Sequence, residues 1–159
     1  MKKRFFIPLL FSLTLQAALL RSQQLTIQPE TGKPTVLSRA DVEALPHSKI
    51  TTGAPDSPVM YDVVALKSLL ERAGVTFDKL SGKRLASCLL VEAADGYHVV
   101  IALPELDPAF TDKQIYVAFL KNGKPLDEKE GPYRIVIPDE KRMARWVRQV
   151  TTLKIVDVN

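Results

Sequence analysis

Near the end of the chain, basic side chains gather around the only tryptophan. In the segment PDEKRMARWVRQVTTLKI, residues 138–155, four basic residues lie close to Trp146: Lys141, Arg142, Arg145 and Arg148. Guanidinium groups bind carboxylates and phosphates through charge-assisted hydrogen bonds, each contributing roughly 1.5–3 kcal/mol where water is excluded. The segment could therefore bind an anionic ligand.

The same residues also allow a simpler interpretation. Asp139 and Glu140 lie close by in the sequence and could pair with the arginines on a solvated surface. Surface ion pairs contribute only ~0–1 kcal/mol. Both interpretations remain open, with Arg142 and Arg145 favoured for ligand binding and Arg148 for a solvated surface.

The spacing of the apolar residues predicts how this segment is displayed. Met143, Trp146, Val147 and Val150 stand at positions i, i+3, i+4 and i+7. This spacing predicts a helical turn that buries all of them on one side. The arginines would then face outward, and Trp146 would lie beneath them.

Other residues that could carry chemistry are few and isolated. Tyr97, in the stretch DGYH, is expected to pack its ring and tether its hydroxyl, and it is a further candidate for the ligand site. Cys88 is the only cysteine, so the chain has no internal disulfide; we expect a small buried residue, with a metal ligand as the alternative. His47 and His98 lack the spacing of a zinc site. The sequence contains no glycine-rich phosphate loop and no obvious Ser/His/Asp set.

The N-terminal residues resemble a secretory signal peptide. Three basic residues, Lys2, Lys3 and Arg4, precede an apolar stretch over 5–20 that ends in small residues. A membrane anchor is the alternative, but a span needs roughly 20 apolar residues, and polar residues interrupt this stretch. We therefore expect residues 1–24 to be a cleavable leader, cut at an undetermined point within 17–24, and the protein to be periplasmic or secreted, without a membrane span after cleavage.

Removal of the leader changes the charge of the protein. The chain has 22 Lys and Arg against 18 Asp and Glu. The leader holds four of the basic residues and no acidic residue, so the remaining chain carries 18 of each. This balance excludes the broad basic surface of a nucleic-acid-binding protein. About 135 residues remain, which predicts a single domain over 25–159.

The rest of the sequence predicts an α+β protein. We expect short strands at 25–27 and 35–37, and a capping box of Ser38 and Asp41 that starts a helix ending near Leu45. In the first half, the next expected elements are a strand at 47–52, a loop at 53–58 and a helix that Gly74 terminates. The second half is expected to contain a hairpin over 84–103 with its turn at Asp95-Gly96, a helical turn at 105–112 and a strand ending at Asn122-Gly123. The last expected strands lie at 131–138 and 151–158. The apolar runs on both sides of Asp95-Gly96 suggest strands buried on both faces. The predicted class is a mostly antiparallel, mixed sheet with two or three short helices.

Three segments in this order resemble a known family. VVALKSLLERAGV, VEAADGYHVVIALPELDPAF and VAFLKNGKPLDEKEGPYRIVIPDEKRMARWVRQVTTLKI are similar to the oxidoreductase molybdopterin-binding domain, the fold of sulfite oxidase catalytic domains. The resemblance covers residues 25–158 and is greatest to the small, stand-alone exported members. It implies a molybdopterin cofactor, and basic side chains near Arg142 and Arg145 that approach its phosphate.

The chain departs from this family at the expected metal ligand. The family's molybdenum-binding cysteine lies just before the helix at 63–74, and here the stretch HSKITTGAPDSPVMYD has none. Ser48, Thr51 and Thr52 are poor replacements for a soft thiolate. The leader also lacks the twin arginines of family members exported with a cofactor already bound.

These departures predict a non-redox binding module without a cofactor. Its ligand would be a small anion or a periplasmic protein, bound by Tyr97, Arg142, Arg145, Trp146 and Arg148. The alternative is a genuine molybdopterin-dependent oxidoreductase, with the metal held through Cys88 or a site completed by a partner subunit.

Overall fold

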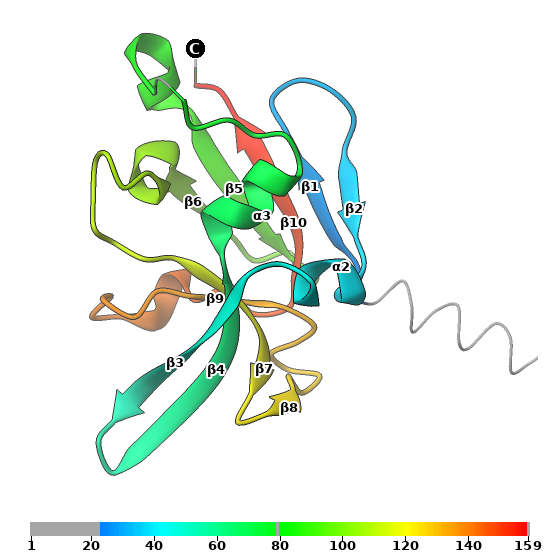
Figure 1. The fold of residues 1–159 in the computed structure, drawn as a ribbon, viewed down its shortest axis with the longest axis vertical. Coiled ribbons are helices and arrows are strands. Elements are labelled where there is room, and N and C mark those ends of the chain that lie inside the picture. The colour runs from blue at the N-terminus through cyan, green and yellow to red at the C-terminus, as the bar shows by residue number, and fades with distance from the viewer. Residues whose placement is uncertain (1–22, 79, 159) are drawn as a thin grey trace, which may run out of the picture.

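A mixed sheet forms the larger part of the fold. The structure is a computed structural model that describes residues 23–78 and 80–158. Its first sheet has the strand order β2 (Thr35–Leu37), β1 (Leu25–Gln28), β10 (Val150–Val156), β5 (Cys88–Ala93) and β6 (His98–Ala102) (Figure 1). β1 and β10 are parallel, with Thr26 opposite Thr152, and the other pairs are antiparallel. The last described strand is therefore central in this sheet.

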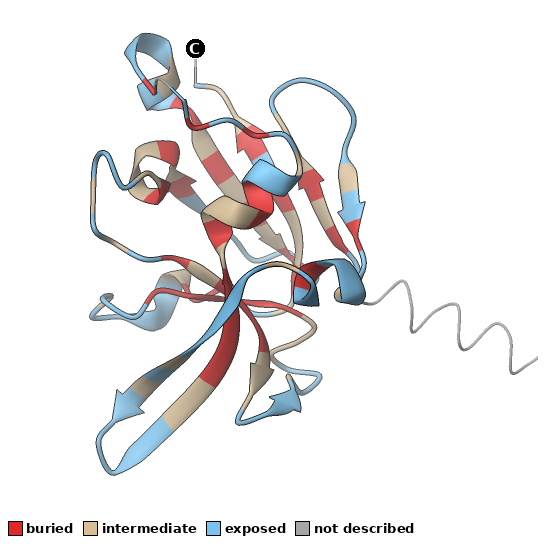
Figure 2. Cartoon of the chain, in the orientation of Figure 1, coloured by how far each residue is buried: buried red, intermediate tan, exposed pale blue. Residues whose placement is uncertain are grey.

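The second sheet is antiparallel throughout. β4 (Ser57–Ala65) pairs with β3 (His47–Ala54) and with β7 (Tyr116–Lys121). β7 also pairs with β8 (Lys124–Pro125) and β9 (Arg134–Val136). The β3–β4 hairpin projects away from the rest of the domain (Figure 1), and most side chains of β3 are exposed (Figure 2).

Short helices connect the strands. α2 (Arg39–Glu43) begins with the predicted capping box, in which Ser38 N–H donates to the Asp41 carboxylate at 2.8 Å, although the helix ends before Leu45. α3 (Leu66–Arg72) is followed by its C-cap Ala73 and then by Gly74, where a φ of +88° favours glycine. Three single turns complete the set: η1 (Gly82–Ala86), η2 (Leu103–Leu106) and η3 (Met143–Arg145).

The core is shared by α3, one face of the first sheet and strands β4, β7 and β9 of the second sheet. Leu66, Leu69 and Leu70 of α3 are fully buried, as are Leu89 and Val91 of β5. Side chains on β5 alternate between buried and half-buried, and Val100 on β6 is 53% exposed. The expectation that β5 and β6 are buried on both faces was therefore wrong for the described residues, because no described element covers their outer face. In an antiparallel sheet one face can be exposed to solvent, so an apolar strand in it need not be buried on both faces.

Most predicted turns are present. The hairpin at Asp95-Gly96 is confirmed, and Asn122 and Gly123 both have positive φ, as a two-residue hairpin turn requires. The loop predicted at 53–58 was wrong, because β3 runs to Ala54 and β4 starts at Ser57. The α+β class is confirmed.

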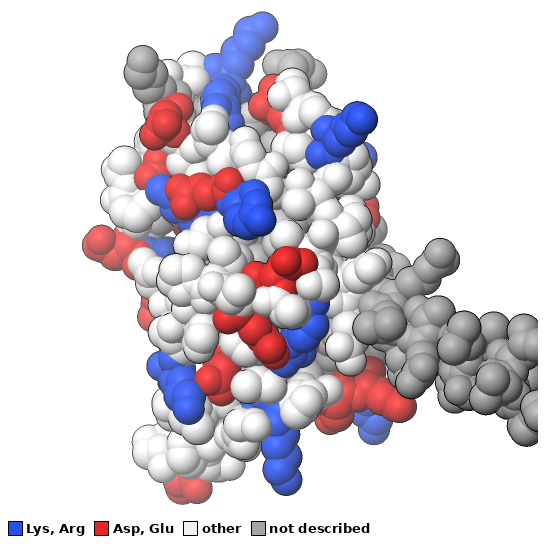
Figure 3. All heavy atoms as spheres, turned by 45° about the vertical axis from the view of Figure 1, so that its right-hand side comes forward, with Lys and Arg blue, Asp and Glu red and all other residues white. Residues whose placement is uncertain are grey.

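Charges of both signs are interspersed on the face shown in Figure 3. No helix in the described part of the chain is long and apolar enough to cross a bilayer. The expected leader lies almost wholly outside the described residues, which begin at Gln23.

Candidate functional site

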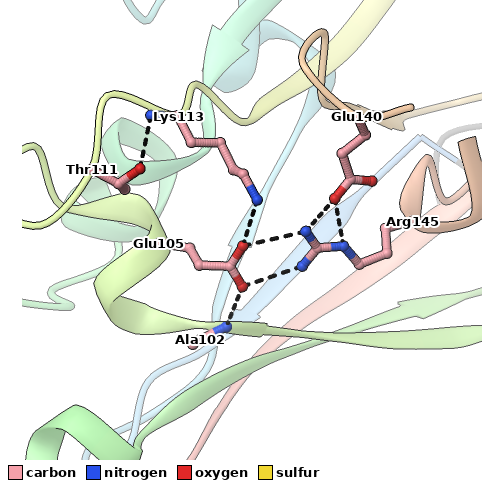
Figure 4. A network of polar contacts seen from close by, with 6 residues as sticks. All are labelled: Ala102, Glu105, Thr111, Lys113, Glu140 and Arg145. Carbon is pink, nitrogen blue, oxygen red and sulfur yellow. Dashed lines mark hydrogen bonds and ion pairs between the residues drawn. The ribbon is translucent and has the colours of Figure 1, made fainter. Parts of the chain in front are cut away.

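Arg145 lies at the centre of a polar network (Figure 4). Its Nη1 and Nη2 donate to the two carboxylate oxygens of Glu105, each at 3.2 Å, and its Nε donates to Glu140 Oε1 at 2.7 Å. Nη2 also contacts Glu140. Glu105 accepts further hydrogen bonds from Lys113 Nζ at 2.9 Å and from the Ala102 N–H at 3.3 Å. The guanidinium of Arg145 is thus occupied by carboxylates of the protein itself.

The network shifts the pKa values of Glu105 and Arg145. Burial alone would raise the pKa of Glu105, but hydrogen bonds from Arg145 and Lys113 outweigh it, so the pKa lies below its ordinary value. The hydrogen bond to Glu105 raises the pKa of Arg145, against burial, and Glu140 adds to the rise. The network therefore stabilises the ionised form of Glu105.

This lowered pKa predicts a pH dependence of stability. A carboxyl group with a depressed folded-state pKa adds stability above its unfolded-state pKa and loses it as the pH falls through the folded-state value. We expect Glu105→Gln to lower the free energy of unfolding by about 1–2 kcal/mol at pH 7, because these hydrogen bonds are charged but partly exposed. Urea unfolding across pH 2.5–7 should show the wild-type and variant curves converging at acidic pH. A constant difference would show that ionisation of Glu105 contributes nothing.

The segment around Trp146 forms only a single 3-10 turn, which does not bury Met143. η3 is a single turn, and Met143 is 58% exposed whereas Trp146 is 5% exposed. The prediction of one helical turn that buries Met143 with Trp146 was therefore wrong. Beyond Trp146 the backbone pairs with the chain at β9: the Ile135 N–H donates to Val147 O at 2.8 Å, and the Val150 N–H donates to Tyr133 O at 2.9 Å. Backbone pairing of distant segments thus overrides the helical spacing.

Tyr97, Trp146 and Arg148 meet at one cavity. Its volume is about 280 Å³, and it lies between the β5–β6 turn and η3. The hydroxyl of Tyr97 donates to Ala144 O at 2.9 Å, as the tethered hydroxyl was predicted to do, but its ring is 48% exposed. The lining residues are Asp95, Tyr97, Met143, Ala144, Trp146, Val147 and Arg148.

Only one of the three predicted arginines lines this cavity. Arg148 lines it, Arg142 is exposed at the start of η3, and Arg145 points to Glu105 and Glu140 instead. Among the described residues, neither Arg142 nor Arg148 forms an ion pair. A role of these residues in ligand binding stays a prediction.

The described residues do not fit a molybdenum held by a protein thiolate. Cys88 is half-buried on β5, where it pairs with Ala102 and Val156 in the first sheet, and it does not line the cavity of Tyr97 and Arg148. β3, in the second sheet, offers the hydroxyls of Ser48, Thr51 and Thr52 and the imidazole of His47, but no thiolate. Within residues 23–78 and 80–158, no group of three or more His, Cys, Asp or Glu side chains is placed to share a metal ion.

A buried arginine was missed by the sequence reasoning. Arg134 is 9% exposed, and its Nη1 contacts Glu130 Oε1 at 2.8 Å and the Tyr61 hydroxyl at 3.3 Å. Its guanidinium carbon lies 5.5 Å from the ring centroid of Trp146 and 5.9 Å from that of Tyr61. The sequence did contain a sign of this residue, because an arginine stands within the apolar run YRIVI. A charged side chain that is buried in such a strand is expected to have a partner.

A larger cavity also lay outside the predicted site. It measures about 590 Å³ and lies between the β1–β10 pair and the loop at 126–132. Its lining contains Asp127 and Glu128 but no lysine or arginine. It is therefore poorly suited to an anion.

Comparisons with known proteins identify a family and a solved structure with a similar fold. A family model described as the oxidoreductase molybdopterin binding domain matches residues 56–159. The crystal structure of the sulfane dehydrogenase SoxCD from Paracoccus pantotrophus is similar, with a TM-score of 0.66 and 22% sequence identity. The likeness covers 86% of this chain but only 39% of the SoxCD chain, and at this identity it shows a common fold. No match was found among curated proteins.

Proposed function

The chain belongs to the oxidoreductase molybdopterin-binding domain family, and from this premise we propose that it is an exported, non-redox binding module of that family. Its ligand would be a small anion that binds beside Tyr97, Trp146 and Arg148. A periplasmic protein that presents a carboxylate or phosphate group is a ligand of the same chemistry. The family membership supports the architecture, and the donor groups of this chain support the loss of redox chemistry.

One observation carries the non-redox part of the proposal. The chain has a single thiol, and it lies on β5 of the first sheet, whereas β3 belongs to the second. Hydroxyl side chains on β3 are hard, neutral donors that bind molybdenum poorly in place of a thiolate. No residue replaces the missing ligand in the described part of the chain.

The charges around η3 support the position of the anion. Arg145 is neutralised by Glu105 and Glu140, so it has little remaining capacity for an external anion. Arg148 is exposed and lines a cavity together with the buried Trp146 and the exposed Tyr97. A guanidinium without an ion pair among the described residues suits a small ligand that carries carboxylate groups.

Export is proposed from the N-terminal residues. Their basic start and apolar run support a cleavable leader, and the absence of a twin-arginine pair supports export as an unfolded chain. A chain threaded in this way would leave the cytoplasm without a preassembled cofactor.

The proposal is tested on protein isolated from its native compartment. We expect neither molybdenum nor pterin at stoichiometric amounts, measured by elemental analysis and by pterin fluorescence after denaturation. The same protein should bind citrate in calorimetry, and Arg148→Gln should weaken this binding about tenfold, the loss of one charge-assisted hydrogen bond. Lys83→Gln, an exposed lysine on η1, is the matched control and should leave binding unchanged.

The alternative function is a genuine molybdopterin-dependent oxidoreductase. It would need Cys88 or a partner subunit to supply the metal ligand. Stoichiometric molybdenum and pterin in the native protein would contradict the non-redox proposal and support this alternative. If Arg148→Gln left citrate binding unchanged, only the proposed position of the anion would be contradicted.

A further inference from the structure

The larger of the two cavities discussed above differs from the proposed anion site in the chemistry of its lining. Its volume of about 590 Å³ lies within the roughly 300–1,000 Å³ typical of small-molecule sites. Its lining residues are Gln23, Gln24, Thr26, Ala94, Leu126, Asp127, Glu128, Gly131, Pro132, Gln149, Thr151 and Thr152. None of them belongs to the proposed anion site.

One wall of this cavity is a tightly closed loop. Asp127 Oδ1 accepts hydrogen bonds from the N–H groups of Lys129 and Glu130, both at 3.0 Å, and Asp127 O accepts one from the Gly131 N–H at 2.7 Å. A side chain at Gly131 would meet the backbone oxygens of Leu126 and Asp127 at 3.0 Å. The loop is therefore shaped before any ligand binds.

Gln149 is held at the cavity in an unfavourable backbone conformation. Its φ is +53°, a region that residues other than glycine seldom occupy. Its N–H donates to Glu130 O, its O accepts from the Ala94 N–H, both at 2.9 Å, and its Nε2 donates to Glu128 O at 2.5 Å. Such conformations persist where the surroundings fix them, often at functional sites. The side-chain oxygen of Gln149 remains as an acceptor for a ligand.

The opposite wall is formed by the parallel strands β1 and β10. Thr26 and Thr152 are directly paired across these strands, so their side chains lie on the same face of the sheet. Neither hydroxyl has a hydrogen bond among those of the described residues. The wall therefore offers two adjacent groups that can each donate and accept.

The lining as a whole favours an uncharged ligand. Beyond Gln23 and Gln24, which belong to the expected leader, it holds Gln149 and three threonines but no lysine or arginine, which disfavours anions. Asp127 already accepts two backbone N–H groups, which satisfies part of its charge and weakens the attraction for a cation. A ligand hydroxyl can donate to a carboxylate or amide oxygen and accept from an amide or threonine. The geometry points to a binding site for a neutral, hydroxyl-rich molecule of monosaccharide or disaccharide size.

The test follows backbone amide signals in NMR spectra during titrations. The probes are glucose, maltose and N-acetylglucosamine as neutral ligands, with putrescine and citrate as charged ones. At least one neutral sugar should shift the amides of Thr26, Gln149 and Thr152. Thr152→Val, which keeps the side-chain shape, should weaken that binding about three- to tenfold by removing one hydrogen bond. Thr35→Val, on β2 of the same sheet, is the matched control and should leave binding unchanged.

Three results would overturn the inference. They are an absence of shifts with every neutral sugar, larger shifts at these amides with putrescine or citrate, and equal binding by Thr152→Val and Thr35→Val. Citrate shifts confined to Tyr97 and Arg148 would support the anion site and leave this inference unaffected. The two proposals can therefore fail separately.

Discussion

Replacing Trp146 with alanine is expected to lower the free energy of unfolding by about 3–5 kcal/mol, the usual cost of removing a buried tryptophan. The residue is 5% exposed, and its Nε1 donates to Ile137 O at 3.0 Å. Its ring also lies beside the guanidinium of Arg134. The substitution would open a void, leave Ile137 O without this donor and expose a buried charge.

Two further variants separate these causes. Trp146→Phe keeps most of the apolar ring but loses the hydrogen bond, so we expect a smaller loss of about 1–2 kcal/mol. Met143→Ala should change the free energy of unfolding by no more than about 0.5 kcal/mol, because Met143 is exposed. Urea unfolding followed by circular dichroism measures all three. A large loss for Met143→Ala would instead favour the helical turn that the sequence predicts.

The second large effect is expected at Arg134. Replacing it with methionine should lower the free energy of unfolding by about 2–4 kcal/mol, because it leaves a largely buried carboxylate without one of its partners. The side chain of Glu130 is 15% exposed and would keep only Lys121, at 3.0 Å. The Tyr61 hydroxyl would also lose its donor. Urea unfolding of the single variant measures the loss.

A double-mutant cycle identifies the cause of this loss. Arg134→Met combined with Glu130→Leu removes both charges, so the double variant should lose clearly less stability than the sum of the single variants. Additive losses would show that Arg134 acts by packing against Tyr61 and Trp146 rather than by pairing with Glu130. Arg134→Lys retains the charge but not the planar fork, and is expected to be intermediate.

Local elements were predictable from the sequence, and their arrangement was not. The capping box at Ser38, the stop at Gly74 and the turns at Asp95-Gly96 and Asn122-Gly123 depend on neighbouring residues, so short patterns identify them. The position of β10 between β1 and β5 depends on pairing between residues far apart in the sequence, such as Thr26 with Thr152 and Leu153 with Val91. No local pattern carries that information, and family resemblance supplied the architecture instead.

The candidate site shows the same limit. Arg145 was identified as a ligand-binding residue from its neighbours in the sequence, and Glu140 was recognised as a nearby acid. Glu105, its bidentate partner, is 40 positions away, and only the fold brings it to the guanidinium. The cavity of Gln149 and Thr152 is formed by four separate stretches of mostly uncharged residues, a combination that sequence patterns do not reveal.

The central position of β10 has a consequence for how the protein acquires its shape. A chain that emerges from a ribosome or a translocation pore with its N-terminus first presents β1 long before β10 exists. β1 then has only the three-residue β2 beside it, and β5 and β6 form an isolated hairpin. Contacts between residues so distant along the chain form late, and they make folding slow. The nascent protein should therefore remain loosely structured, and open to chaperones, until its last strand is released.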